Sequence, residues 1–256
     1  MPPLRVPDGP GRPYLSPVEL TADAIAALLV DGEIDVVGRV AWSSNAALLV
    51  TVTRDDVEML AVYKPERGER PLWDFPDGSL CRREMSAFLL SESLGWDIVP
   101  CTVLRDGPYG VGSVQRFVDH DPDEHYFTLL EGHVDAFWRF AVFDVIANNA
   151  DRKGGHCLRE RPTGKIFGID HGLTFHVAPK LRTVIWDFAS EAVPDSLLSD
   201  VARVRGRLDG PLADEFAMLL HPMEVDALLD RIDQILIDGR LPEPDEGYHS
   251  VPWPMI

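Results

Sequence analysis

The pattern of hydrophobic and polar positions divides the chain into a strand-rich first half and a helix-rich second half. In the first half, short runs rich in Val, Ile and Thr lie between turn residues, a pattern typical of antiparallel strands. Two stretches with helical spacing interrupt or precede these runs. We expect helices over 17–30 and 79–94, and strands over 34–42, 47–53, 58–64, 99–104 and 112–118.

The second half contains a wide apolar stripe over 134–148, which predicts a buried central helix. A small hairpin is expected over 156–169, further helices over 196–239, and a proline-rich, non-helical end. The chain is therefore predicted to be an α+β protein of two lobes. These are an antiparallel-sheet N-lobe over 17–118 and a mainly helical C-lobe over 119–256, preceded by a flexible arm over 1–16.

The helix expected over 79–94 lies between the strands of the N-lobe. Ser79 is a favourable residue for its N-cap, and Gly95 for its end. Met85, Phe88 and Leu89 recur at helical spacing and are expected to form its apolar side.

Composition limits the classes of partner. A net charge of −18 over 256 residues argues against general affinity for nucleic acid or anionic lipid. No apolar run reaches the roughly 18 residues of a membrane span, so we expect no integral membrane contact. The three cysteines are odd in number and widely spaced, which favours a reducing cytoplasm over a disulfide framework.

Charged side chains crowd into a glycine-rich turn directly after the central helix, and a second acid, Asp170, precedes Gly172 after an apolar run. A hairpin between the two motifs can bring both carboxylates to one point, the geometry that phosphoryl transfer requires. Asp151 is interpreted as the acid that receives or orients the acceptor proton. Arg152 and Lys153 are expected to offset charge on the transferred phosphoryl group. A helix C-terminus alone explains the basic residues and the glycines but disfavours an acid.

Metal binding is the expected role of Asp170. His156 is either a second metal ligand or a structural imidazole. Since Mg²⁺ prefers oxygen ligands, the position of this histidine beside the acids does not decide between the two roles. A metal-dependent hydrolase could use the same acids with nearby histidines, although no dense ligand motif such as His-Glu-x-x-His occurs. The residues for that alternative are Asp151, His156, Asp170, His171 and His176.

In the N-lobe, Lys64 ends the third expected strand and Glu84 stands near the start of the next helix. A strand lysine held by a helix glutamate is typical of a site for the α- and β-phosphates of a nucleotide. Taken alone, Lys64 is better explained as an exposed charge at the end of a strand and Glu84 as a first-turn helix charge. Their order before the two acidic motifs favours the phosphate-binding interpretation.

Two further segments are candidates for nucleotide contacts. The turn containing Ser43, Ser44 and Asn45 offers amides and hydroxyls that can cradle phosphates, although it is neither a Walker loop nor a Gly-x-Gly-x-x-Gly motif. The last N-lobe strand, at the lobe junction, is expected to offer backbone groups to an adenine edge. Its residues are Gln115, Arg116, Phe117 and Val118.

The order Lys64, Glu84, Asp151, Asp170 resembles atypical kinases of the phosphatidylinositol 3-/4-kinase superfamily. The chain is most similar to the small bacterial branch like type II phosphatidylinositol 4-kinases, and HipA-type kinases share its catalytic plan. It is also similar to an actinobacterial branch grouped with these kinases. The resemblance covers about 34–188 and rests on Tyr63-Lys64-Pro65, the Arg-Glu helix block over 82–90, Val99-Pro100, 112–117, Asn149-Ala150-Asp151-Arg152 and the block over 169–175.

This resemblance implies a bilobal kinase-like fold that uses ATP with Mg²⁺ or Mn²⁺. Lys64 would bind the ATP phosphates, Glu84 would hold that lysine, Asp151 would act as catalytic base and Asp170 would bind the metal. The family has an asparagine as second metal ligand five residues after the catalytic aspartate. Here His156 stands at that position, and Mn²⁺ tolerates a nitrogen ligand better than Mg²⁺ does.

The function expected from these features is an ATP-dependent phosphotransferase acting on a hydroxyl of a protein, a small molecule or a phosphoinositide. The alternative is a pseudokinase, a nucleotide-binding module without turnover, which the replacement at His156 favours. His176, Lys180 and Arg182 follow the second motif and read either as a receptor for an anionic acceptor or as ordinary surface charge.

Overall fold

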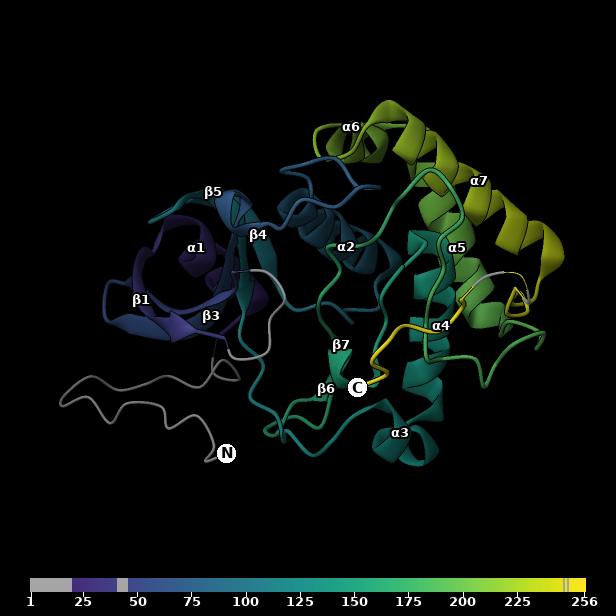
Figure 1. Cartoon of the computed structure of the whole chain (residues 1–256), viewed down its shortest axis with the longest axis horizontal. Helices are drawn as coiled ribbons and strands as arrows, with labels where there is room; N and C mark the ends of the chain where they lie inside the picture. The colour runs from purple at the N-terminus through teal and green to yellow at the C-terminus, as the bar shows by residue number, and fades with distance from the viewer. Residues whose placement is uncertain (1–19, 41–45, 246, 248) are drawn as a thin grey trace.

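A computed structural model of the chain describes residues 20–40, 46–245, 247 and 249–256. The arm expected over 1–16, and the turn residues Ser43, Ser44 and Asn45, lie outside the described residues. A sheet with one helix against it forms one lobe, and helices form the other (Figure 1). The predicted α+β architecture of two lobes is confirmed.

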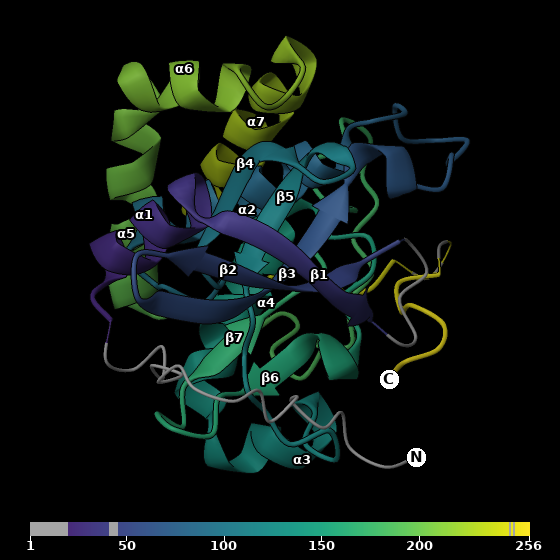
Figure 2. The same ribbon diagram turned by 90° about the vertical axis from the view of Figure 1, so that its left-hand side faces the viewer.

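The N-lobe is built on one antiparallel sheet with the strand order β1-β2-β3-β5-β4. Alternate residues of β2 and β3, among them Val50, Val52 and Ala61, are buried beneath the helix α1, which supplies Leu28 and Leu29. Figure 2 shows this sheet face-on with α1 lying across it. The elements are α1 (Ala22–Asp31), β1 (Glu33–Arg39), β2 (Leu48–Arg54), β3 (Val57–Pro65), β4 (Thr102–Gly107) and β5 (Gly110–Arg116).

Helix α2 (Leu80–Leu94) follows β3 after a short 3-10 turn, η2 (Glu66–Gly68), and a loop. Its Ala87, Leu90 and Leu94 join the core of the helical lobe. The apolar side expected from Met85, Phe88 and Leu89 is only half-buried. The fully buried face instead carries Arg83 and Glu84, because this helix lies between the two lobes and brings polar groups to their junction.

Ser79 stands at the N-cap position of α2, as expected, but its side chain does not cap the helix. The carboxylate of Glu69 accepts the first amides of the helix, from Leu80 at 3.1 Å and from Cys81 at 2.8 Å. The hydroxyl of Ser79 donates to the carbonyl of Pro76 at 2.6 Å instead. A charged acceptor from the start of the preceding loop therefore takes the place of the serine hydroxyl.

The C-lobe surrounds α4 (Val134–Ala147), whose aromatic side chains Phe137, Phe140 and Phe143 are buried as the wide apolar stripe predicted. The hairpin and the later helices are also confirmed, and the residues that the structure describes after α7 (Pro222–Asp238) are not helical. Among the described residues, no helix has the length and apolar character needed to cross a bilayer. The remaining elements are α3 (Tyr126–Leu129), η3 (Leu130–Gly132), η4 (Gly154–His156), β6 (Cys157–Arg159), β7 (Ile166–Gly168), α5 (Asp195–Arg207), α6 (Pro211–Ala217) and α7 (Pro222–Asp238).

Candidate active site

Three charged residues from distant parts of the chain meet between the lobes. The ammonium of Lys64, near the end of β3, lies 2.5 Å from Glu84 Oε1 on α2 and 2.5 Å from Asp170 Oδ1 after β7. The second oxygen of Glu84 accepts the amide of His171 at 3.1 Å. Burial alone would lower the pKa of Lys64, but the two carboxylates outweigh it and raise that pKa above its ordinary value. The lysine is therefore held as a cation inside the cleft.

The backbone at Asp170 is in the left-handed region, with φ 59°. Non-glycine residues rarely adopt this conformation, although Asp and Asn tolerate it better than most. Burial would raise the pKa of Asp170, but the charge and the hydrogen bond of Lys64 outweigh burial and lower that pKa. The side chain is 44% exposed and ionised, so it can meet a ligand from the cleft.

His156 faces the same carboxylate, with Nε2 3.5 Å from Asp170 Oδ2. Burial lowers the pKa of His156 to about 4, so the imidazole is neutral at pH 7 and can act as a ligand. Two donors at this separation fit a divalent cation with bonds of about 2.0–2.2 Å to each. Among the described residues, no group of three or more His, Cys, Asp or Glu could hold a metal. Phosphate oxygens and water would therefore have to complete the coordination.

The loop after α4 carries Asp151, whose carboxyl is near enough to Asp170 to feel its charge but does not line the cavity between the lobes. Asn148 ends the helix in the left-handed conformation, with φ 51°, and the amide of Asp151 donates to Asn149 Oδ1 at 3.1 Å. Burial raises the pKa of Asp151, while Lys153, whose Nζ lies 3.1 Å from Asp151 Oδ2, opposes that rise. Lys153 lines that cavity, so its ammonium links this acid to the cavity wall.

Arg152 lies elsewhere than expected. Its side chain is completely buried, and its Nε and Nη2 bind the two oxygens of Asp144 at 3.0 and 2.9 Å. Its Nη2 also donates to His171 Nε2 at 2.8 Å. This placement contradicts the expected contact with a transferred phosphoryl group. The residue instead fixes both acidic motifs to α4.

Asp144 is the site residue that sequence reasoning missed. It is fully buried, and it accepts further hydrogen bonds from Asn149 at 2.9 Å and Thr183 at 3.2 Å. A carboxylate in the apolar last turns of the central helix, just before a buried turn, was the available signal, because such a group needs partners.

A cavity of about 700 Å³ lies between the lobes, and its lining includes Lys64 and Asp170 but not Glu84 or Asp151. Lys64, Lys153, His156 and Asp170 line it, as do the four residues expected at the adenine edge. Sequence reasoning missed its apolar walls, because they are ordinary alternating strand positions, and also missed two residues near the end of the chain. These are Val40, Ala47, Leu49, Val62, Leu158, Ile169, Pro254 and Ile256.

The strand at the lobe junction lines the cavity but does not offer all the backbone groups expected. The amide of Arg116 donates to Cys101 O at 2.9 Å, and that of Phe117 donates to Leu60 O at 3.1 Å. The carbonyl oxygen of Val118 accepts a hydrogen bond from His120 Nδ1 at 2.8 Å. Because the sheet uses these two amides, the expectation that they meet adenine is corrected.

The side chains of the same strand are used within the protein. Gln115 Nε2 donates to Thr102 Oγ1 at 2.8 Å. Arg116 is buried and pairs with Glu160 Oε1 at 2.5 Å, which ties the strand to the loop after β6. The side chains of Phe117 and Val118 line the cavity.

The basic residues after the second motif, His176, Lys180 and Arg182, mostly contact other residues of the protein. Lys180 Nζ pairs with Asp74 at 2.7 Å, and the ring of His176 lies edge-on to Phe75 with centroids 5.2 Å apart. The amide of Arg182 donates to Asn149 O at 2.8 Å. Since His171 also turns to Arg152, neither His171 nor His176 joins Asp170 as a ligand, and the hydrolase reading loses its ligand set.

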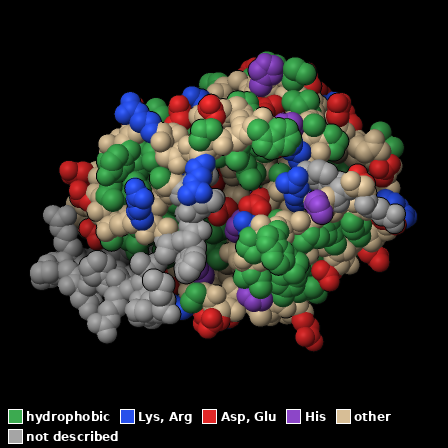
Figure 3. Space-filling view, in the orientation of Figure 1, with side chains coloured by type: hydrophobic (Ala, Val, Ile, Leu, Met, Phe, Trp, Pro, Cys, Tyr) green, Lys and Arg blue, Asp and Glu red, His purple; other side chains and the backbone are tan. Residues whose placement is uncertain are grey.

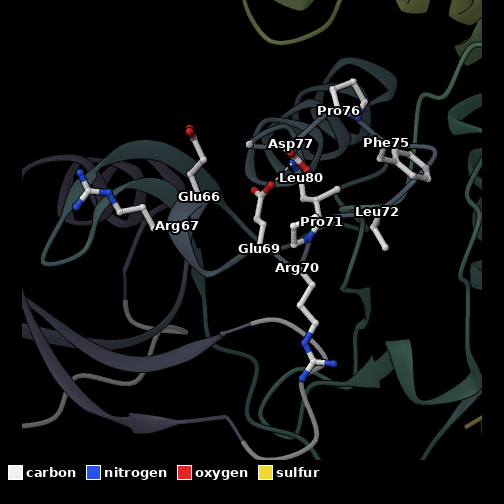
Figure 4. A pocket seen from close by; sticks show the side chains of 11 residues that line it. Glu66, Arg67, Glu69, Arg70, Pro71, Leu72, Phe75, Pro76, Asp77 and Leu80 are labelled. Carbon is white, nitrogen blue, oxygen red and sulfur yellow. Dashed lines mark hydrogen bonds between the residues drawn. The ribbon is translucent and has the colours of Figure 1, made fainter.

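A second cavity, of about 330 Å³, lies in the loop before α2 (Figure 4). Its lining includes Glu66, Arg67 and Glu69, but neither of the two acidic motifs. Figure 4 shows Glu69 reaching toward Leu80 while Arg70 extends away from it. The carboxylate of Glu69 in this cavity therefore caps helix α2.

Comparison with known proteins agrees with this geometry. Residues 104–221 match the family model described as phosphatidylinositol 3- and 4-kinase. The chain is 41% identical over 263 residues to protein Rv2133c of Mycobacterium tuberculosis (strain ATCC 25618 / H37Rv), a match that covers 89% of this chain and 94% of the relative.

Among solved structures, the fold is similar to that of the Helicobacter pylori proinflammatory kinase CtkA. The TM-score is 0.50 and the identity 14%, over 80% of this chain and 92% of that one. At this identity the likeness concerns the fold alone. The chain belongs to the same family as protein Rv2133c and is an atypical kinase-like protein of the phosphatidylinositol 3-/4-kinase type.

Proposed function

We propose that the protein is an ATP-dependent phosphotransferase that moves the γ-phosphoryl group to a hydroxyl of a protein, a small molecule or a phosphoinositide. One observation carries the proposal: Lys64 Nζ lies 2.5 Å from both Glu84 and Asp170. A strand lysine, a helix glutamate and a metal-binding aspartate in mutual contact are the parts that hold a triphosphate for transfer.

The roles of the residues follow from their positions. Lys64 turns from Asp170 to the phosphates when nucleotide enters, and Glu84 keeps it in place. Asp170 and His156 would hold Mg²⁺ or Mn²⁺, which would neutralise the phosphate charge. Asp151 accepts the proton of the acceptor hydroxyl, and its raised pKa makes it a better base. Lys153, paired with Asp151, stabilises charge on the transferred group.

The acceptor would react at the loop that carries Asp151 and Lys153. We expect this chemistry in a reducing cytoplasm, in keeping with the free thiols of Cys81, Cys101 and Cys157.

The test is turnover of labelled ATP by the purified full chain, with Mg²⁺ and Mn²⁺ in separate reactions and a panel of hydroxyl acceptors. The proposal requires label transfer or ATP hydrolysis that needs metal and that is lost in Asp170→Asn. Nucleotide binding without turnover under any metal would favour the pseudokinase alternative, which rests on His156 in place of an asparagine. Absence of any nucleotide binding would contradict both.

A further inference from the structure

The described residues after α7 return to the proposed active site. We call residues 249–256 the strap. Figure 1 shows this yellow end of the chain crossing α4 and stopping beside β6. It therefore reaches the hairpin and the loop that carry the two acidic motifs.

Two sets of backbone hydrogen bonds hold the strap. The carbonyl of Ser250 accepts the amide of Thr183 and the indole N–H of Trp186, both at 3.0 Å. The carbonyl of Met255 accepts the amide of Gly154 at 2.7 Å, and Pro252 between them is buried. The strap is thus fixed at one end to the segment after Asp170 and at the other to the loop of Asp151.

Gly154 makes room for Phe127 and the strap, whereas a side chain at Gly155 would make only an ordinary contact with the strap. A Cβ on Gly154 would lie 3.1 Å from the ring of Phe127 and 3.3 Å from the carbonyl oxygen of Met255. A Cβ on Gly155 would lie 3.8 Å from Ile256 Cγ2. Close approach of the strap gives a reason for Gly154 that helix termination and phosphate chemistry do not supply.

Pro254 and Ile256 line the same cavity as Lys64 and Asp170. Ile256 is nevertheless 60% exposed. Figure 3 shows hydrophobic side chains gathered in the middle of this face, beside a hollow where acidic and basic side chains meet. When a ligand covers an exposed apolar side chain at the edge of a cavity, the removal of that apolar surface from water favours binding.

We infer that Pro254 and Ile256 form a wall of the nucleotide site and pack against the bound nucleotide, an inference that rests on the proposed function. The cavity retains about 700 Å³ with the strap in place. This lies within the roughly 300–1,000 Å³ typical of small-molecule sites. The strap therefore borders the cavity without filling it.

The test compares two cysteine variants of the full chain, Ile256→Cys and Trp253→Cys. Trp253 is 87% exposed and, unlike Ile256, does not line the cavity. Maleimide labelling is followed by intact mass, with the parent chain correcting for its own cysteines. Saturating ATP with Mn²⁺ should slow labelling of Ile256→Cys at least about tenfold and leave Trp253→Cys within twofold, since bound nucleotide covers one thiol and not the other.

A second measurement follows affinity. Ile256→Ala should raise the Kd of a fluorescent ATP analogue about three- to tenfold, the effect of losing a half-buried aliphatic side chain, while Ile256→Leu should stay near the parent value. Equal labelling rates with and without nucleotide, or tighter binding by Ile256→Ala, would overturn the inference. If the parent chain binds no nucleotide, the proposed function fails instead, so the two failures are distinguishable.

Discussion

The carboxylate of Asp144 lies inside an apolar helix and accepts hydrogen bonds from Asn149, Arg152 and Thr183. Arg152 in turn donates to His171, next to the proposed metal ligand. One buried ion pair thus ties both acidic motifs to α4, in addition to direct contacts between the motifs such as the amide of Ile169 donating to His156 O at 3.0 Å. Removal of one partner of such a pair leaves an uncompensated buried charge, which is far more costly than losing both.

We therefore expect Asp144→Ala to destabilise the protein by about 3–5 kcal/mol, which lowers the melting temperature by roughly 6–20 °C. The double variant Asp144→Leu with Arg152→Met should lose much less than the sum of its two single variants. As a control, Asp119→Ala breaks a pair with Arg161 whose partners are 60% and 54% exposed, and should change stability by at most about 1 kcal/mol. Denaturant unfolding measures all of these. A single Asp144 variant as stable as the parent would contradict this account.

Asp151 should be required for turnover and not for nucleotide binding. Asp151→Asn is expected to lower the turnover number by about 10²–10⁴-fold, the contribution of a general base, while the Kd for the nucleotide changes little. Labelled ATP measures the first quantity and a fluorescent analogue the second. Equal turnover in the variant and the parent would remove Asp151 from the mechanism.

His156 should set the metal preference. His156→Asn replaces a neutral nitrogen ligand by an oxygen ligand and is expected to shift relative activity from Mn²⁺ toward Mg²⁺ by several-fold. The measurement is turnover against concentration for each ion. An unchanged ratio of the two ions would show that the imidazole does not contact the metal.

At the scale of elements, α2 is the part that joins the lobes. Glu84 reaches Lys64 in the sheet, while the buried guanidinium of Arg83 pairs with Glu224 on α7 and donates to Thr174 O at 2.5 Å. The first turn of α2 depends on Glu69 from the preceding loop. The position of the proposed phosphate-binding lysine therefore depends on how this helix begins.

Glu69→Ala should destabilise the protein by about 0.5–2 kcal/mol through loss of the helix cap, and Glu69→Gln by less. Asp77→Ala, an exposed residue of the same loop, serves as the control and is expected to stay within about 0.5 kcal/mol. Thermal and denaturant unfolding give the values. A larger effect of Asp77→Ala than of Glu69→Ala would contradict the assigned cap.

Most elements were predictable because each carries a local signal. Alternation marks β2 and β3, a wide apolar stripe marks α4, and Gly95 ends α2 with a left-handed φ of 72°. The cap by Glu69 was not predictable, since it depends on a loop folding back. The turn between β4 and β5 is also shorter than expected, because β4 continues to Gly107 and pairs it with Gly110.

The candidate site divides in the same way. The two acidic motifs, Lys64 and Glu84 stood out by residue type and order. The burial of Arg152 could not be predicted. The sequence does not show which of several adjacent charged residues in a turn points into the core. The contribution of Ile256 depends on long-range contact and has no local pattern.

At the scale of the molecule, the cavity takes residues from both lobes and from the strap. A ligand that contacts several parts of the native state and does not bind the unfolded chain stabilises all of them together. Nucleotide should therefore stabilise the fold as a whole.

ATP with Mn²⁺ at about 100 times its Kd should add about 2.7 kcal/mol, which raises the melting temperature by roughly 5–11 °C. Chelation of the metal, or Asp170→Asn, should remove most of this shift. Differential scanning calorimetry measures it. A shift of equal size in the presence of the chelator would show that the nucleotide binds without the ion.

The hydrogen bond between Met255 and Gly154 has a practical consequence for anyone who handles this protein. An affinity tag or fluorescent reporter fused behind Ile256 would emerge beside the cavity between the lobes. Such a fusion would obstruct the proposed nucleotide site. Assays should therefore use material from which any appended sequence has been cleaved.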